Sequence, residues 1–156
     1  MTQYQERHYR DAFAELSVES NSTATVVSSS STDFSNKVQV TIFDSVGPSQ
    51  DMIPNLSSGH IEITRKGVHK FSATNLSFSG TSGDTISLAF FKNNGATQIS
   101  KRVTRKLGTG GDVGAVGISG LAFCEVGDTV ELWLQNEGAT GNVTVEDVTM
   151  IAESKR

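Results

Sequence analysis

The amino-acid sequence predicts an all-β domain, a sandwich or barrel of about eight or more short strands. The composition favours strands: Ser and Thr are abundant, and the 156 residues include 15 Gly but only 2 Pro. Apolar and polar residues alternate with a period of two in several segments, and turn residues separate these segments about every 8–12 residues. Beyond the N-terminal region no stretch has helical periodicity, and the length corresponds to one domain.

Residues 1–35 are predicted to form an N-terminal arm and a first strand, both Ser/Thr-rich, ahead of a folded domain at 36–156. The beginning of the arm places aromatic side chains among charges and allows a short helical turn from Asp11 to Leu16. An alternation that begins at Leu16 then fades into a low-complexity run of serines. Such a stretch buries little apolar surface, so we expect a loop or an edge strand there.

Period-two alternation predicts the next strands. It is regular in four segments, at 38–42, 61–63, 68–79 and 86–90. A loop that carries Gly47-Pro48 and Pro54 is expected between the first two of them. The segment 68–79 changes parity midway, which is the effect of one extra residue in a strand, so a β-bulge is expected near Thr74-Asn75.

The second half of the chain continues the pattern. Asn93-Asn94-Gly95 predicts a hairpin turn, because Asn and Gly accept positive φ. A returning strand is expected at 97–107, and a flexible glycine loop at 108–114 follows it. The last strands are expected at 116–123, 130–135 and 143–150, the third with a parity shift at Glu146-Asp147.

The alternation also predicts which side chains form the core. In the strand at 130–135, Val130, Leu132 and Leu134 share one face, and Trp133 lies on the other. We expect burial of eleven residues: Ile61, Ile63, Phe71, Ile86, Leu88, Phe90, Val130, Leu132, Leu134, Val143 and Val145.

No residue pattern indicates catalysis, a cofactor or a metal, so the protein is not expected to be an enzyme. His8, His60 and His69 match no metal-binding spacing, and solvent-facing histidines are expected. Cys124 is the only cysteine, which excludes an internal disulfide, and a buried, unreactive thiol is expected. The glycine loop at 108–114 precedes no helical pattern, so no helix N-terminus is predicted to bind a phosphate there.

The charge and hydropathy patterns exclude several partners. The formal net charge is −4 with no basic tract, so nucleic acid is not expected to bind. No apolar run approaches the length that spans a membrane, and no membrane partner is expected. The segment Met1–Arg10 lacks the apolar region of a signal peptide, so synthesis in a reducing cytoplasm is expected.

The block from Gly59 to Met150 resembles the C1q/TNF-type jelly roll. The resemblance rests on Gly67–Ala73, where that family has a Gly-x-Tyr-x-Phe-Ser signature and this chain has His69 in place of the tyrosine. It also rests on the hairpin at Phe91–Gly95 and on Val126–Leu132, which is similar to the family's Gly-Asp-x-Val-x-Leu motif. The resemblance implies a jelly-roll β-sandwich that associates as a homotrimer.

Other segments resemble small virion proteins of tailed bacteriophages. These segments are Ala14–Val18 with Thr23–Val26, Glu131–Asn136 and Asn142–Val145. The resemblance implies a capsid decoration (cement) protein that binds the outer surface of the head, where its partner is the major capsid protein or another virion protein. The alternative is a tail or head fibre knob that binds a host receptor. A sugar-active or sugar-binding enzyme with Trp133 as its aromatic platform is a third, less favoured hypothesis.

Two sets of residues are predicted to make the contacts. The arm offers aromatic and arginine side chains to the virion partner, at Tyr4, Arg7, Tyr9, Arg10 and Phe13. Trp133 is a large aromatic side chain opposite the apolar face of its strand, so a neighbouring copy is expected to cover it. The trimer seam is therefore predicted around Phe90 and Trp133.

Overall fold

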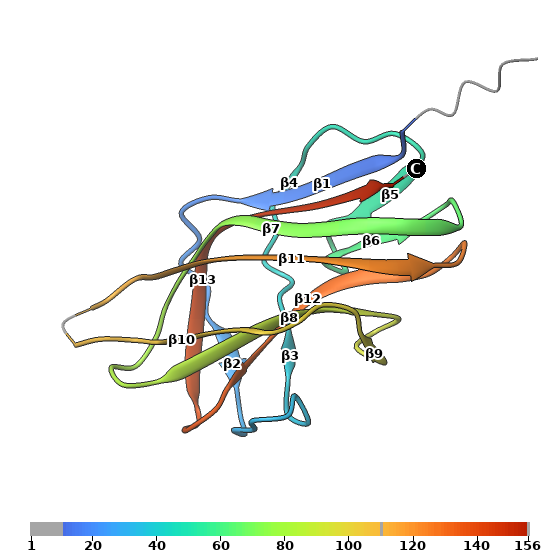
Figure 1. Ribbon diagram of the computed structural model, residues 1–156. Coiled ribbons are helices and arrows are strands. Elements are labelled where there is room, and N and C mark those ends of the chain that lie inside the picture. The colour runs from blue at the N-terminus through green and yellow to red at the C-terminus, as the bar shows by residue number, and fades with distance from the viewer. Residues whose placement is uncertain (1–10, 110, 156) are drawn as a thin grey trace, which may run out of the picture.

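The computed structural model describes residues 11–109 and 111–155, which form two antiparallel sheets packed face to face (Figure 1). The first sheet has the order β11-β7-β13-β1-β4, with β2 beside β13. The second has the order β10-β8-β12-β6-β5, with β3 beside β12 and β9 beside β8. The strands are β1 Phe13–Val18, β2 Thr25–Val27, β3 Val38–Gln39, β4 Ser45–Val46, β5 Met52–Asn55, β6 His60–Ile63, β7 Gly67–Ser79, β8 Thr85–Lys92, β9 Thr97–Gln98, β10 Val103–Lys106, β11 Gly114–Cys124, β12 Thr129–Asn136 and β13 Gly141–Ser154. The predicted all-β sandwich is confirmed.

The N-terminal region corrects the prediction most strongly. The helical turn that the sequence allows at Asp11–Leu16 does not form, because β1 occupies this region and pairs with β13 along its whole length. Ala14, Leu16 and Val18 alternate on one face and are buried in the core. Two-residue alternation matches a strand, and pairing with a long neighbour outweighs a weak helical preference. The sandwich therefore begins within 1–35, the region predicted to hold an arm and a first strand, and it includes Phe13, which was expected to lie in the arm.

The residues between β2 and β3 cross the outer face of the second sheet. Gln135 in β12 anchors them, since its Oε1 atom accepts hydrogen bonds from Ser31 Oγ at 2.7 Å and from the Phe34 backbone N–H at 2.6 Å. Residues 28–37, which looked like low-complexity loop, thus cover part of the sandwich. We call them the covering segment.

Two strand boundaries also differ from the expectation. Pro54 lies in β5 rather than in a loop, and β5 is an edge strand, where the missing N–H of proline breaks no ladder. The returning strand at 97–107 is split into β9 and β10. Between them the Ser100 hydroxyl accepts the hydrogen bond of the Phe90 N–H at 2.9 Å, so a side chain replaces the backbone partner.

The predicted bulges and turn are confirmed. In β7 the ladder to β11 shifts between Val116 and Ile118, opposite Thr74-Asn75, and Asn75 has φ 49°. The ladder between β7 and β13 shifts between Val145 and Asp147, at the predicted place, and β13 bends strongly in Figure 1. The hairpin Asn93-Asn94-Gly95 has φ values of 58°, 57° and 75°. Asn and Gly suit these left-handed backbone angles.

The core lies between the two sheets, and the predicted core residues are confirmed. All eleven have at most 1% of their surface exposed, and Leu132 is at 0%. The strand parity predicted for β12 is therefore correct. Phe71 of the first sheet and Phe90 of the second meet across the core with ring centroids 6.1 Å apart.

Candidate functional site

Phe90 does not belong to a seam. Its side chain is fully buried within its own chain, where it packs against Phe71. A neighbouring copy can cover only surface that the single chain leaves exposed, so the prediction for Phe90 is wrong. Alternation explains the misplacement: Phe90 has the inward parity of Ile86 and Leu88 on β8.

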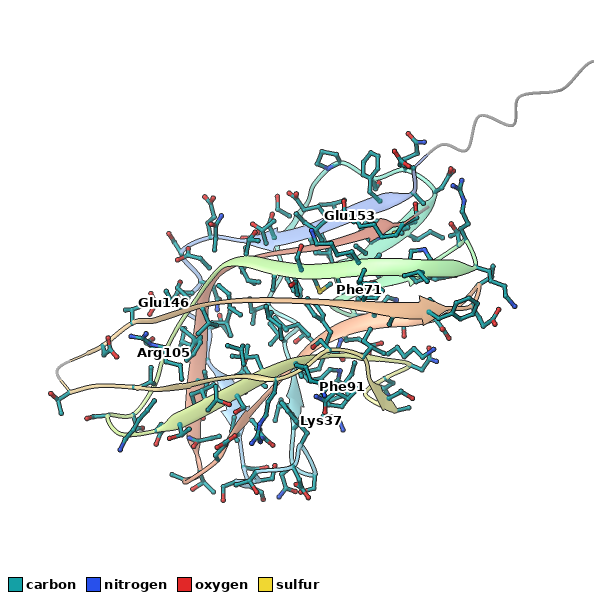
Figure 2. The ribbon with its side chains drawn as sticks, viewed as in Figure 1. Lys37, Phe71, Phe91, Arg105, Glu146 and Glu153 are labelled. Atoms are coloured by element: carbon teal, nitrogen blue, oxygen red, sulfur yellow. The ribbon has the colours of Figure 1, made fainter. Side chains whose placement is uncertain are left out.

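Trp133 lies on the outer face of the second sheet, as predicted, but its own chain covers much of it. Phe34 of the covering segment packs edge-on against Phe91 at 5.3 Å, and Phe91 packs against Trp133 at 6.2 Å. The Lys37 ammonium lies 4.8 Å from the Phe91 ring centroid and 5.2 Å from that of Trp133 (Figure 2). Lys37 thus occupies a place where a sugar would stack on Trp133.

The outer face of the first sheet is exposed in comparison. Val68 in β7 and Leu121 and Phe123 in β11 point outward, with 42%, 63% and 53% of their surfaces exposed. Phe123 pairs directly with Val68 across the two strands. These three residues form one continuous group, which we call the apolar strip. We call the whole outward surface of this sheet the open face.

An ionic cluster lies beside the apolar strip. The ladders place Leu121, Lys70, Glu153 and Phe13 in one row across four strands of the open face. The Glu153 carboxylate accepts from Lys155 Nζ at 2.8 Å and from Lys70 Nζ at 3.3 Å. The hydrogen bond from Lys155 is the main reason why the pKa of Glu153 is below its ordinary value. The open face therefore has apolar side chains on both sides of an ionic cluster of two lysines and one glutamate.

Only one of the five residues predicted to contact the virion partner from the arm lies among the described residues. Phe13 lies in β1 and belongs to the open face, so it is part of the sandwich rather than of an arm. Tyr4, Arg7, Tyr9 and Arg10 lie outside the described residues.

The far end of the open face has a hollow of about 450 Å³ beside the two bulges. Asp147 lines it and accepts hydrogen bonds from the Ser20 N–H at 2.9 Å and from Ser77 Oγ at 2.7 Å. The bond from Ser20 is the largest cause of the lowered pKa of Asp147. These bonds join the turn after β1 to the bulged strands, so Asp147 has a structural role.

His69 and Cys124 lie in the interior of the sandwich. His69 is 1% exposed, which corrects the expected solvent-facing histidine, because it shares the inward parity of Phe71. Burial also raises the pKa of the Cys124 thiol to about 11, so the expected buried, unreactive cysteine is confirmed. His60 lies in β6 and is half-buried, whereas His8 lies outside the described residues. Within 11–109 and 111–155, no three His, Cys, Asp or Glu residues gather as a metal site would require.

Stability should fall on mild acidification because of His69. Its Nδ1 atom is 3.0 Å from the Gly67 carbonyl oxygen, Nε2 has no partner, and burial followed by nearby Arg65 lowers its pKa. The unfolded chain, with an ordinary pKa of about 6.5, then binds this proton first as the pH falls. Urea unfolding at pH 7.5, 6.0 and 5.0 should show decreasing stability, and His69→Phe should weaken that trend.

Between pH 7.5 and 5.0 the effect of His69 on stability can be measured apart from the effect of the carboxylates. The pKa values of Asp33, Asp128, Asp147 and Glu153 are lowered, so their contribution is lost only when the pH falls below their ordinary values of about 4. An equal loss of stability between pH 7.5 and 5.0 in wild type and in His69→Phe would contradict the assignment to His69.

The described part of the chain contains no helix that is long and apolar enough to cross a membrane. No family model matches the sequence, and no curated protein matches it. Among solved structures, the chain is similar to the crystal structure of murine APRIL at pH 5.0, with a TM-score of 0.59 and 9% sequence identity. The likeness covers 94% of this chain and 100% of that chain.

The fold is therefore a TNF/C1q-like jelly-roll sandwich, as the sequence resemblance predicted. At 9% identity the likeness to murine APRIL shows the fold and nothing further.

The sequence contained an overlooked signal for the open face. Val116 and Ile118 have one parity in β11, and Leu121 and Phe123 have the other. A strand with large apolar residues on both parities has two apolar faces, one of them outside the sandwich.

Proposed function

We propose that the protein is a structural virion protein that associates as a homotrimer through the open face and decorates the outer surface of a tailed-bacteriophage head. One observation carries the self-association. The covering segment packs on the outer face of the second sheet, whereas the apolar strip on the first sheet remains exposed. A contiguous apolar group on one face of a sheet is typical of a protein–protein interface.

The role in the virion is supported by the sequence. Ala14–Val18, Glu131–Asn136 and Asn142–Val145 resemble small virion proteins, and they lie in or next to the strands β1, β12 and β13. The partner in this proposal is the major capsid protein or another virion protein. A fibre knob that binds a host receptor is the competing role.

Self-association can be tested by making the apolar strip polar. Light scattering should give the wild type three times the mass of one chain, and the double variant Leu121→Ser/Phe123→Ser should have the mass of one chain. Both side chains are exposed, so folding of the variant should be retained. Val126→Ser is the matched control, because Val126 is 65% exposed but lies in the turn before β12. A monomeric wild type at micromolar concentration would overturn the proposal.

Attachment to the head needs a separate experiment. Purified protein is mixed with heads that lack it, and the heads are pelleted. Stoichiometric co-sedimentation is expected, with weaker binding by the monomeric double variant, because a trimer binds through several copies at once. Binding to host cells without binding to heads would favour the fibre knob and contradict decoration.

A further inference from the structure

The β11 strand is an edge strand of the first sheet. It is 11 residues long, contains neither charge nor proline, and pairs only with β7 among the described residues. Exposed edges invite pairing with other chains, and proteins usually blunt them with lysine, proline or short strands. β11 itself is long and contains no lysine or proline, so its edge is open to pairing with another segment except where Lys92 and Ser100 contact it.

Backbone groups on the outer edge of β11 point away from β7. The Phe123 carbonyl oxygen shows this direction, since it accepts a hydrogen bond from Lys92 Nζ at 3.5 Å. Because backbone groups alternate sides along a strand, those of Ser119 and Leu121 point the same way. Within the described parts of the chain, no backbone hydrogen bond joins β11 to the neighbouring residues 97–107.

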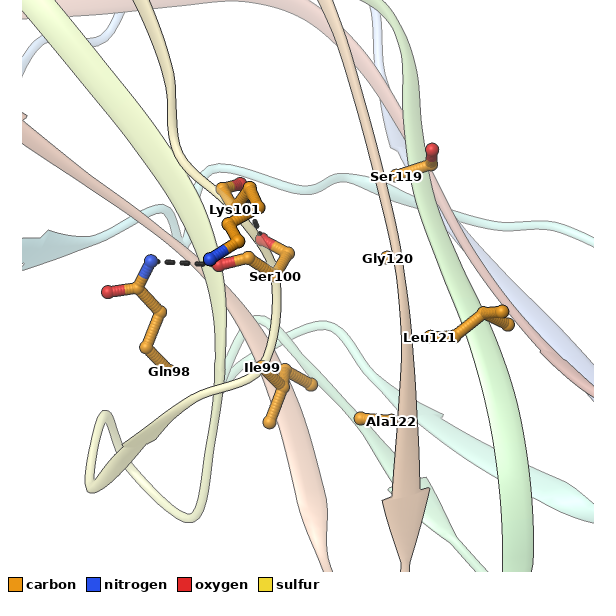
Figure 3. Close-up of a pocket in the computed structure, with 8 residues that line it drawn as sticks. All are labelled: Gln98, Ile99, Ser100, Lys101, Ser119, Gly120, Leu121 and Ala122. Atoms are coloured by element: carbon orange, nitrogen blue, oxygen red, sulfur yellow. Dashed lines mark hydrogen bonds between the residues drawn. The ribbon is translucent and has the colours of Figure 1, made fainter.

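A groove runs along this edge. It has a volume of about 700 Å³ and lies between residues 98–101 and the Ser119–Ala122 part of β11 (Figure 3). The groove is narrow at Gly120, where β11 lies close to Ser100. A Cβ atom at position 120 would be 2.8 Å from the Ser100 Cβ. Gln98 and Ser100 hydrogen-bond within their own segment, to the carbonyl oxygens of Ser100 and Lys101 at 2.8 and 3.0 Å. The groove therefore has the edge of β11 on one side. On the other side lie polar side chains that already have hydrogen-bond partners in their own segment.

We propose that residues 1–10 of a neighbouring copy pair with the free edge of β11. In an extended conformation, ten residues span about 33 Å, close to the roughly 36 Å length of an 11-residue strand. The segment contains Tyr4 and Tyr9, which have opposite strand parity, so one of the two tyrosines suits a cross-strand contact with Leu121 or Phe123. Its charges at Glu6, Arg7 and Arg10 meet no like charge on β11.

The geometry favours a neighbour over the same chain. The segment leaves the domain next to β1, where Ala12 and Ser154 exchange hydrogen bonds of 3.0 and 2.8 Å. An added strand beyond β11 is four strand spacings from β1, about 19 Å, and crossing that distance would use about six of the ten residues. The inference rests on the proposed self-association, and it assigns Tyr4 and Tyr9 to a neighbouring copy instead of to the shell.

Amide hydrogen exchange in mixed assemblies tests the proposal. Isotope-labelled copies that lack residues 1–10 are refolded alone and together with unlabelled full-length copies. The labelled amides of Ser119 and Leu121 should exchange at least tenfold more slowly in the mixture. An unchanged exchange rate in an assembly of trimeric mass would overturn the strand pairing alone, whereas a monomeric mass would overturn the self-association.

A second variant tests the edge in the full chain. Ser119→Pro removes an N–H that points away from β7, and Ser119→Ala keeps that N–H as the matched control. Amides of residues 4–9 should lose protection in Ser119→Pro and keep it in Ser119→Ala. Equal protection in both variants would overturn the proposal.

Discussion

Phe90→Ala is expected to lower the free energy of unfolding by about 3–5 kcal/mol. Phe90 is fully buried, and it contacts Phe71 of the opposite sheet at a centroid distance of 6.1 Å. Truncation removes apolar surface from the centre of the core and leaves a cavity between two sheets that cannot close easily. A seam residue would behave differently, because its loss would change the mass of the assembly more than the stability of one chain.

The experiment should be done in the monomeric background Leu121→Ser/Phe123→Ser. Unfolding is then independent of protein concentration, and urea titration gives the stability of one chain. Val126→Ala is the exposed control and should change stability by less than about 0.5 kcal/mol. A loss below about 1 kcal/mol for Phe90→Ala would contradict its place in the core.

Local alternation was sufficient to predict the interior. The parity of Leu132 and of Phe71 follows from their immediate neighbours, because successive strand side chains point to opposite faces. The turn at Asn93–Gly95 and the bulge near Asn75 were also predictable, since positive φ and parity shifts are local properties. The resemblance at Gly67–Ala73 then selected the jelly roll from the sandwiches that such strands can form.

The errors at His69 and Phe90 could have been avoided by local parity, whereas the error at Trp133 concerns contacts between distant parts of the chain. The cover over Trp133 comes from Phe34 and Lys37, about a hundred residues earlier, in a stretch with little apolar content. No periodicity in that stretch indicates which surface it will cover. The seam was misplaced for this reason: an aromatic residue on an outer face was taken as exposed, although its own chain covers much of it.

The first strand shows the same limit. Ala14, Leu16 and Val18 are too few to predict a strand by themselves, and their partner β13 lies at the other end of the sequence. Once paired, they close one side of the core. An N-terminal arm thus ends before Ala12, which already hydrogen-bonds to Ser154 beside β1, and this boundary can be tested directly by truncation.

Two truncations should differ sharply in stability. Removal of residues 1–10 in the monomeric background should leave the melting temperature within a few degrees of the parent, since all the strands and core residues that the structure describes lie at later positions. Removal of residues 1–16 should unfold the protein at room temperature. It deletes most of β1, including Leu16, whose burial alone contributes about 2–5 kcal/mol.

Backbone contacts add to that loss. Deletion of β1 leaves the edge of β13 unpaired from Met150 to Glu153 and removes the two hydrogen bonds of 2.9 and 2.8 Å that Phe13 exchanges with Gln50. The combined loss of buried surface, strand pairing and hydrogen bonds is comparable to the whole free energy of unfolding of a domain, about 5–15 kcal/mol. Circular dichroism melts of both truncations, with Leu16→Ala as the point control, measure the difference. A 1–16 truncation that melts like its parent would show that β1 is a detachable arm after all.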